Sequence, residues 1–146
     1  MTTIAAAWGV LRSRAESSIS LPMYWPNESI RLPDTPTAFV YFEIDPQLAF
    51  VAGFGGGRGA NLYRNQADLN AFVFVPVEEG IELAMTYGET VAAVFRSFRD
   101  ANVSCFEASV HPIGRGAELT PPGLSAIAGN YFCAVVIVAM HFDQVG

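Results

Sequence analysis

The sequence predicts an α+β fold, in which a mainly antiparallel sheet of about five strands with a long hairpin packs against an N-terminal helix and a central helix. Strand-forming segments follow one another with only one helical segment between them, which favours pairing through hairpins. The 146 residues match the length of one domain, and 51% of them are hydrophobic, enough for a substantial core. No internal repeat or change of composition marks a boundary, so residues 1–146 are expected to form a single domain.

An amphipathic helix is predicted over residues 3–17. Its apolar residues recur at helical spacing: Ile4, Ala7, Trp8, Leu11 and Ala15. Arg12, Arg14 and Glu16 lie mostly on the other side, so the apolar stripe is expected to face the core. Residues 20–36 contain four prolines, each of which removes a backbone donor and disfavours helix before its ring. They are expected to form an extended, irregular connection.

Stretches rich in β-branched and aromatic residues predict the first strands. Residues 37–45 form one such stretch, and the Asp-Pro pair after it predicts a turn into a second strand over 47–54, giving an antiparallel hairpin. Residues 55–66 are expected to form a mobile, glycine-rich loop. The next strand, 69–77, is apolar on both faces, so we expect helices on one face and a neighbouring subunit on the other.

The central helix is predicted over residues 81–102. Its apolar residues recur every three or four positions, the pattern of a helix packed on a sheet: Ile81, Met85, Gly88, Val91, Phe95 and Phe98. A glycine inside a helix costs up to about 1 kcal/mol relative to alanine, so Gly88 indicates close backbone packing. The remaining segments are a strand over 103–113, a long loop over 114–130 and a final strand over 131–143.

Composition argues against several classes of function. Charged residues make up 15%, below the roughly 25% of an average soluble domain, and Phe occurs 11 times, so we expect apolar surface to be buried against another subunit. The net charge is −6 and the eight basic residues, all arginines, form no cluster, so direct nucleic-acid binding is not expected. Cys105 and Cys133 are expected to be reduced core residues of a cytosolic protein. The longest apolar run, 131–140, has about half the length of a membrane span, and the N-terminal segment lacks a signal-peptide pattern.

The residues predict no enzyme activity, no metal and no cofactor. The glycine-rich run 53–59 lacks the lysine of a Walker loop and the helix of a dinucleotide fingerprint, so a hairpin tip is the preferred interpretation. His111 and His141 lie in predicted strands, where a catalytic or metal role would need partners brought beside them by folding. The acidic residues near the start of the central helix suit its macrodipole: Glu78, Glu79 and Glu82.

Two sets of motifs occur in order along the chain. The first is a Trp-Pro-Asn-Glu motif in the proline-rich connection: Trp25, Pro26, Asn27 and Glu28. Pro33 and Pro36 follow before the first strand. The second set flanks the strand before the central helix and the two ends of that helix: Tyr63, Arg64, Pro76, Gly80, Phe95 and Arg96. In order and spacing over residues 4–143, these motifs resemble those of the tail terminator, or tail-completion, proteins of long-tailed bacteriophages and gene transfer agents.

The resemblance implies a structural protein of the virion tail, without catalytic residues or cofactors. Such proteins form a hexameric ring on the last ring of the tail tube, where they stop tube growth and offer a surface to which the DNA-filled head attaches. The implied partners are further copies of the chain, the tail tube protein and a head-completion or connector protein. DNA would pass through the lumen without specific binding, which an acidic surface suits. The implied location is the tail–head junction of the virion, after assembly in the cytoplasm of a bacterial host.

On this interpretation, the long hairpin reaches a neighbouring subunit and its glycine-rich tip adapts to a partner ring, through a heterologous interface. The candidate interface residues are Gly55, Gly56, Gly57, Arg58, Tyr63 and Arg64. For Arg58 and Arg64, plain surface exposure is an equally open interpretation. Two other functions are weighed: a head-to-tail connector or minor tail protein, and a small enzyme or ligand-binding domain with a pocket around Tyr24 and Trp25.

Overall fold

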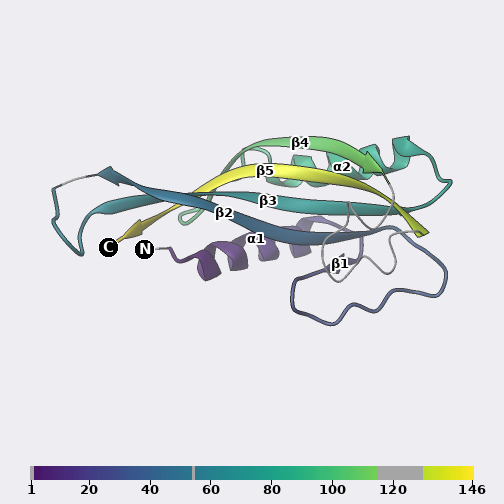
Figure 1. The fold of residues 1–146 in the computed structure, drawn as a ribbon, viewed down its shortest axis with the longest axis horizontal. Coiled ribbons are helices and arrows are strands. Elements are labelled where there is room, and N and C mark those ends of the chain that lie inside the picture. Colours follow the sequence, from purple (N-terminus) through teal and green to yellow (C-terminus); the bar gives the residue numbers. More distant parts are fainter. Residues whose placement is uncertain (1, 54, 115–129) are drawn as a thin grey trace.

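The computed structural model describes residues 2–53, 55–114 and 130–146, which form two helices and one five-stranded sheet (Figure 1). The helices are α1 (Ile4–Ser18) and α2 (Ile81–Phe95), and the strands are β1 (Met23–Tyr24), β2 (Phe39–Gly53), β3 (Leu62–Pro76), β4 (Ser104–Gly114) and β5 (Tyr131–Val145). The strands lie in the order β1-β2-β3-β5-β4, and all neighbours are antiparallel except the short parallel pair of β1 and β2. The predicted α+β class is confirmed. Most of the predicted loop 114–130 lies outside the described residues.

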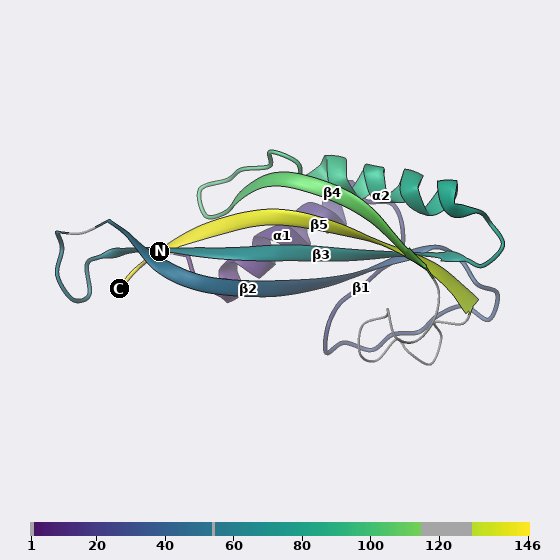
Figure 2. The same ribbon diagram turned by 45° about the horizontal axis from the view of Figure 1, so that its top comes forward.

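Both helices cover the same face of the sheet, and Figure 2 shows the strands in front of α1. The Thr3 hydroxyl accepts a hydrogen bond of 3.1 Å from the backbone N–H of Ala6 and so caps the start of α1. The buried residues of α1 belong to the predicted stripe: Ala7, Leu11 and Ala15. Ile4 differs from the prediction, because it is 40% exposed and lines an open groove beside β2.

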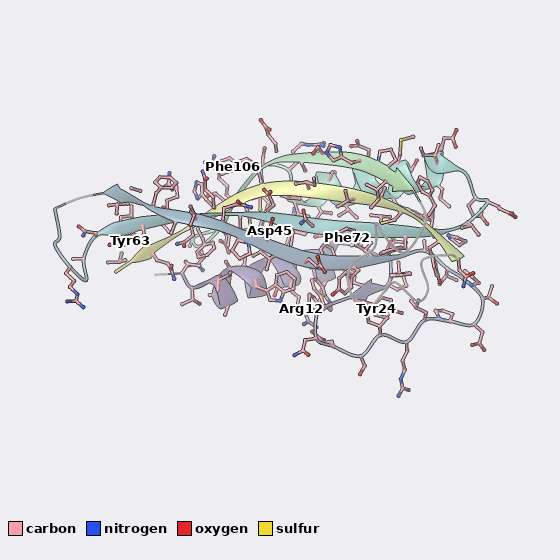
Figure 3. The ribbon with its side chains drawn as sticks, in the orientation of Figure 1. Arg12, Tyr24, Asp45, Tyr63, Phe72 and Phe106 are labelled. Atoms are coloured by element: carbon pink, nitrogen blue, oxygen red, sulfur yellow. The ribbon has the colours of Figure 1, made fainter. Side chains whose placement is uncertain are left out.

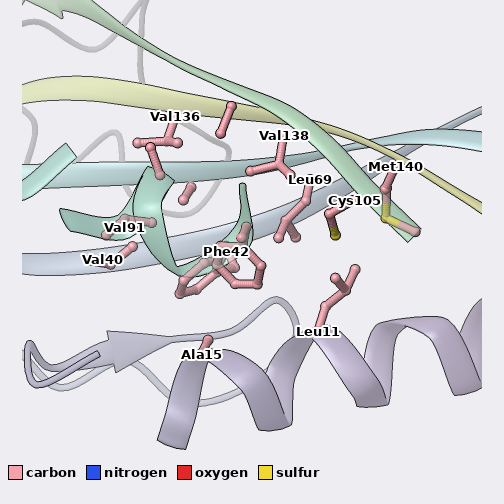
Figure 4. Close-up of a cluster of buried hydrophobic side chains, with 14 of the residues drawn as sticks. Leu11, Ala15, Val40, Phe42, Leu69, Val91, Cys105, Val136, Val138 and Met140 are labelled. Atoms are coloured by element: carbon pink, nitrogen blue, oxygen red, sulfur yellow. The ribbon is translucent and has the colours of Figure 1, made fainter. Parts of the chain in front are cut away.

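The main core lies between this face and the helices (Figure 4). Both helices and four strands contribute to it: Leu11, Val40, Phe42, Leu69, Val91, Cys105, Val136, Val138 and Met140. A smaller aromatic cluster lies at one end of the opposite face, where Phe39 stacks on Phe74 at 4.8 Å and meets Tyr131 edge-on at 5.1 Å. Residues of the proline-rich connection pack on this cluster: Tyr24, Ile30 and Leu32. The connection therefore covers part of the second face, and a neighbouring subunit over the rest stays a prediction.

The predicted turn at Asp45 and Pro46 is wrong, because β2 passes through both residues as one continuous strand. This part of β2 is a sheet edge, whose only strand partner among the described residues is β3, so the missing N–H of proline can face outward. A register shift between Pro46 and Ala49 also accommodates the ring. The long hairpin is therefore formed by β2 and β3. Phe54, the last residue of the predicted second strand, lies outside the described residues.

The predicted mobile loop 55–66 is wrong over its last residues, because β3 already begins at Leu62. Tyr63 lies opposite Val51 of β2 and Gln144 of β5, well inside the paired region. These residues are mostly polar, so the apolar pattern that predicts strands did not extend to them.

The central helix is shorter than predicted, because α2 ends at Phe95. Ser97 has a left-handed backbone with φ of 59°, and the N–H of Phe98 donates to the carbonyl of Phe95 at 2.9 Å, which turns the chain away from the helix axis. Gly88 confirms the expected close packing. A Cβ at this position would lie 2.7 Å from Cγ1 of Val110 in β4.

Candidate functional site

The Trp-Pro-Asn-Glu motif fastens the proline-rich connection to α1, and we call residues 25–28 the clasp. The Trp25 ring stacks on Phe42 of β2 with centroids 4.7 Å apart, and it meets Trp8 of α1 edge-on at 5.6 Å. The guanidinium carbon of Arg12 lies 4.7 Å from the centroid of the same ring. Trp25 is consequently only 6% exposed.

Polar contacts and backbone conformation complete the clasp. Glu28 accepts two hydrogen bonds from the Arg12 guanidinium (labelled in Figure 3), one from Nη1 and one of 3.1 Å from Nη2. These hydrogen bonds lower the pKa of Glu28 and raise the pKa of Arg12. Asn27 has φ of 58°, in the left-handed region that asparagine adopts more readily than most residues. The motif thus has a structural role in this chain.

Tyr24 and Trp25 are both engaged within their own chain, so the expected ligand pocket does not depend on their rings. The Tyr24 hydroxyl donates to the carbonyl of Arg31 at 2.9 Å, and its ring meets Phe39 edge-on at 5.4 Å. A hollow of about 460 Å³ lies nearby, between α1 and β2, and we call it the α1 groove. Its lining residues are Ile4, Ala5, Trp8, Pro26, Glu43 and Ile44.

Pro76 and Gly80, the remaining motif residues, mark the ends of structural elements. Pro76 is the last residue of β3 and lies opposite Tyr131 of β5. Gly80, with φ of 83°, directly precedes α2. The positive φ explains the glycine at position 80, and Pro76 ends the pairing of β3 with β5.

β2 and β3 extend past the helices as an arm, formed by residues 47–53 and 55–66 (Figures 1 and 2). Its tip depends on glycines with positive φ: Gly55 (120°), Gly57 (70°) and Gly59 (88°). A Cβ at Gly56 would lie 2.3 Å from the carbonyl oxygen of Ala60. The glycines of the predicted tip therefore adopt a turn conformation that residues with a Cβ would adopt only with strain.

The end of β5 pairs with the β3 side of the arm, from Gln66 opposite His141 to Leu62 opposite Val145. Arg64 donates two hydrogen bonds to Asp143, from Nε to Oδ1 at 2.9 Å and from Nη2 to Oδ2 at 2.8 Å. Beside this pair, Asn65 Nδ2 donates to Gln144 Oε1 at 3.0 Å. Arg64 therefore has a partner in its own chain, and its contact with a neighbouring subunit stays a prediction.

We expect Asp143→Asn to lower the free energy of unfolding at neutral pH. Hydrogen bonds from Arg64 lower the pKa of Asp143 below its ordinary value of 3.8. Such a carboxylate stabilises the fold above its unfolded-state pKa, and this contribution is lost as pH falls through the folded-state pKa. In urea unfolding, wild type and variant should therefore converge only when the pH falls below the lowered pKa of Asp143, which lies under 3.8. Asp34→Asn, at an exposed position, is the control. If Asp143→Asn lowered the free energy of unfolding equally at low and neutral pH, the ion-pair explanation would be contradicted.

The surface of the arm combines apolar side chains with a cation. Leu48 is 89% exposed and Phe50 is 47% exposed. Arg58 is exposed at the tip and has no ion-pair partner within the described part of the chain, whereas Tyr63 (labelled in Figure 3) is half-buried. The sequence does not single out Leu48 and Phe50, because a strand pattern does not say which apolar side chains stay uncovered. Pro46, two residues before Leu48, was the sequence feature that could have indicated an edge strand.

The sheet face without helices has a group of carboxylates. Asp45 of β2 lies directly opposite Asp68 of β3, and like charges in this arrangement are destabilising. Glu43 is two residues before Asp45 on the same strand and hence on the same face, and burial raises its pKa. None of these three has an ion-pair partner in residues 2–53, 55–114 and 130–146.

Groups that carry catalysis are not assembled in the described residues. These residues contain no cluster of three or more His, Cys, Asp and Glu that could hold a metal ion. Both cysteines are free and buried, and burial raises the pKa of Cys105 to about 11 and that of Cys133 to about 12. Ser109 Oγ lies 2.8 Å from His111 Nε2, but both residues are exposed and no described carboxylate hydrogen-bonds to His111. No described helix has the length and hydropathy of a membrane crossing.

Comparison with known proteins supports the fold. No family model matches the chain, and no curated protein matches its sequence. A solved structure of a protein whose name states no function is similar over 95% of this chain and 96% of its own, with a TM-score of 0.51 and 16% sequence identity. At this identity the likeness shows the fold alone.

Proposed function

We propose that the protein is a tail terminator, which caps the tail tube as a hexameric ring, ends elongation and provides the surface for head joining. The arm is the observation that carries this proposal. It extends past both helices, and Leu48 on it has 89% of its surface uncovered. Burying one such side chain stabilises an interface by about 1.5 to 3 kcal/mol, so the arm suits a contact with another subunit.

The position of the arm is compatible with a ring, when the arm-to-neighbour contact is not reciprocated within one pair of copies. It lies at one end of the sheet, so an arm that contacts another region of a neighbouring copy makes a heterologous interface, and repetition of that interface can close a ring. The net charge of −6 agrees with a lumen through which DNA passes without binding. A connector or minor tail protein would have the same general features but would bind the portal side.

The proposal is tested by adding the purified protein to growing tail tubes and imaging the tube ends by negative stain. We expect a ring at one end and an arrest of lengthening. A variant that lacks residues 55–59 should lose capping by at least about tenfold while its circular dichroism stays unchanged, because the body of the sheet does not depend on the tip. Tubes that lengthen normally beside folded wild-type protein contradict the proposal, and binding to the portal side instead indicates a connector.

Charge reversal at the tip gives a finer test of the same surface. Arg58→Glu should weaken capping, whereas Arg31→Glu, an exposed arginine of the proline-rich connection, is the matched control. Arg64 is unsuitable for this purpose, because its reversal would also break the ion pair with Asp143. Equal capping by both variants would exclude Arg58 from the interface.

A further inference from the structure

The α1 groove is apolar with one carboxylate at its border. Ile4 is 40% exposed there, and Ile44 of β2 faces the groove from the other side. Glu43 lines it at the free edge of β2, and no described residue forms an ion pair with Glu43. β1 pairs with β2 only as far as Tyr41, so the groove stays open at this edge. The groove can therefore receive apolar side chains accompanied by a positive charge.

The arm of the same chain has these properties. Leu48 and Phe50 supply exposed apolar side chains, and Arg58 supplies a cation without an ion-pair partner among the described residues. Glu43 supplies uncompensated negative charge at the border of the groove. The two surfaces complement each other in polarity and in charge, which favours a second copy of the chain over an unrelated partner.

The arm cannot fill the groove of its own chain. Leu48 follows Ile44 by four residues on one extended strand, which places the two about 13 Å apart along β2. β2 is paired with β3 on both sides of Leu48, at Pro46–Ala67 and at Ala49–Asn65. The contact must therefore join different molecules.

We propose that the arm of one copy docks in the α1 groove of the next, with Leu48 and Phe50 against Ile4, Trp8 and Ile44. Arg58 of the first copy then supplies positive charge toward Glu43 at the border of the groove in the second. Repeated in one direction the contact is heterologous, and in this ring form it rests on the proposed tail-terminator function.

Disulfide trapping between two single variants tests this contact. Leu48→Cys and Ala5→Cys place thiols on the arm and in the groove, at exposed positions, whereas the native cysteines are buried. The two variants are mixed, with and without tail tubes, and oxidised. We expect a linked dimer on the order of tenfold more abundant than with either variant alone, because docking holds the two thiols at high effective concentration. When both substitutions are in the same chain, oxidation should give disulfide-linked oligomers of increasing size, the largest with six subunits.

The matched control replaces Ala5→Cys by Ala93→Cys, on the exposed surface of α2. If the yield of disulfide-linked dimer is no greater than in this control, the arm–groove contact is overturned. If negative stain nevertheless shows rings on the tubes, the tail-terminator function stands without that contact. Trapping without rings or capping would support the contact and contradict the terminator function. Absence of both trapping and rings would contradict both.

Discussion

Replacing Trp25 by alanine is expected to lower the free energy of unfolding by about 3 to 5 kcal/mol, the range for large aromatic residues truncated in a core. The ring is 6% exposed and contacts Phe42 by stacking and Trp8 edge-on. Its removal would leave a cavity between α1 and β2 and would uncover the face of the Arg12 guanidinium that lies over it. Urea unfolding at neutral pH measures the change from the midpoint and the slope.

Phe106→Ala is the control for this experiment, because Phe106 is an aromatic residue of β4 that is 37% exposed. Its loss should cost less than about 1.5 kcal/mol, because a side chain that already reaches solvent leaves no closed cavity behind. If Trp25→Ala proved as mild as this control, the clasp would not be what holds the proline-rich connection on the body. The motif would then be free to serve a binding role.

Gly88→Ala is expected to destabilise the protein by about 1 to 3 kcal/mol, the usual cost of overpacking. The added methyl would lie 2.7 Å from Cγ1 of Val110, closer than carbon atoms pack. Helix propensity alone predicts the opposite sign, a gain of up to about 1 kcal/mol. The sign of the measured change therefore separates tertiary packing from helix propensity.

Gly9→Ala is the matched control, because Gly9 lies in α1 and a Cβ there meets nothing within 4 Å. It should stabilise the protein by about 0.5 to 1 kcal/mol. Combining Gly88→Ala with Val110→Ala should recover much of the loss, because it removes the methyl groups that clash. A stabilising Gly88→Ala would show that β4 moves away from α2 with little resistance.

The helices and the class of the fold could be predicted because they depend on local periodicity. Ala7, Leu11 and Ala15 follow the helical repeat, and burial confirms it. The ends of elements depended on neighbours in space instead. Pro46 indicates a turn in isolation, but it is compatible with a strand wherever its missing donor faces no partner strand.

The candidate site was only partly predictable, for the same reason. The clasp motif could be recognised, but its role needs Arg12 and Glu28, which are 16 residues apart and meet only after folding. The exposure of Leu48 likewise depends on where α1 begins and β1 ends, which no local pattern gives. Chemistry that links distant segments cannot be obtained from periodicity alone.

One continuous strand, β2, contains Phe42 in the core, Ile44 in the α1 groove and Leu48 on the arm. A tension applied to the arm would therefore pass directly along covalent bonds into the core. Because β3 pairs with β2 along almost its whole length, that load would be shared as shear by many backbone hydrogen bonds at once. In the proposed ring of docked subunits, tension between neighbouring copies would therefore be carried by this strand pair in each copy.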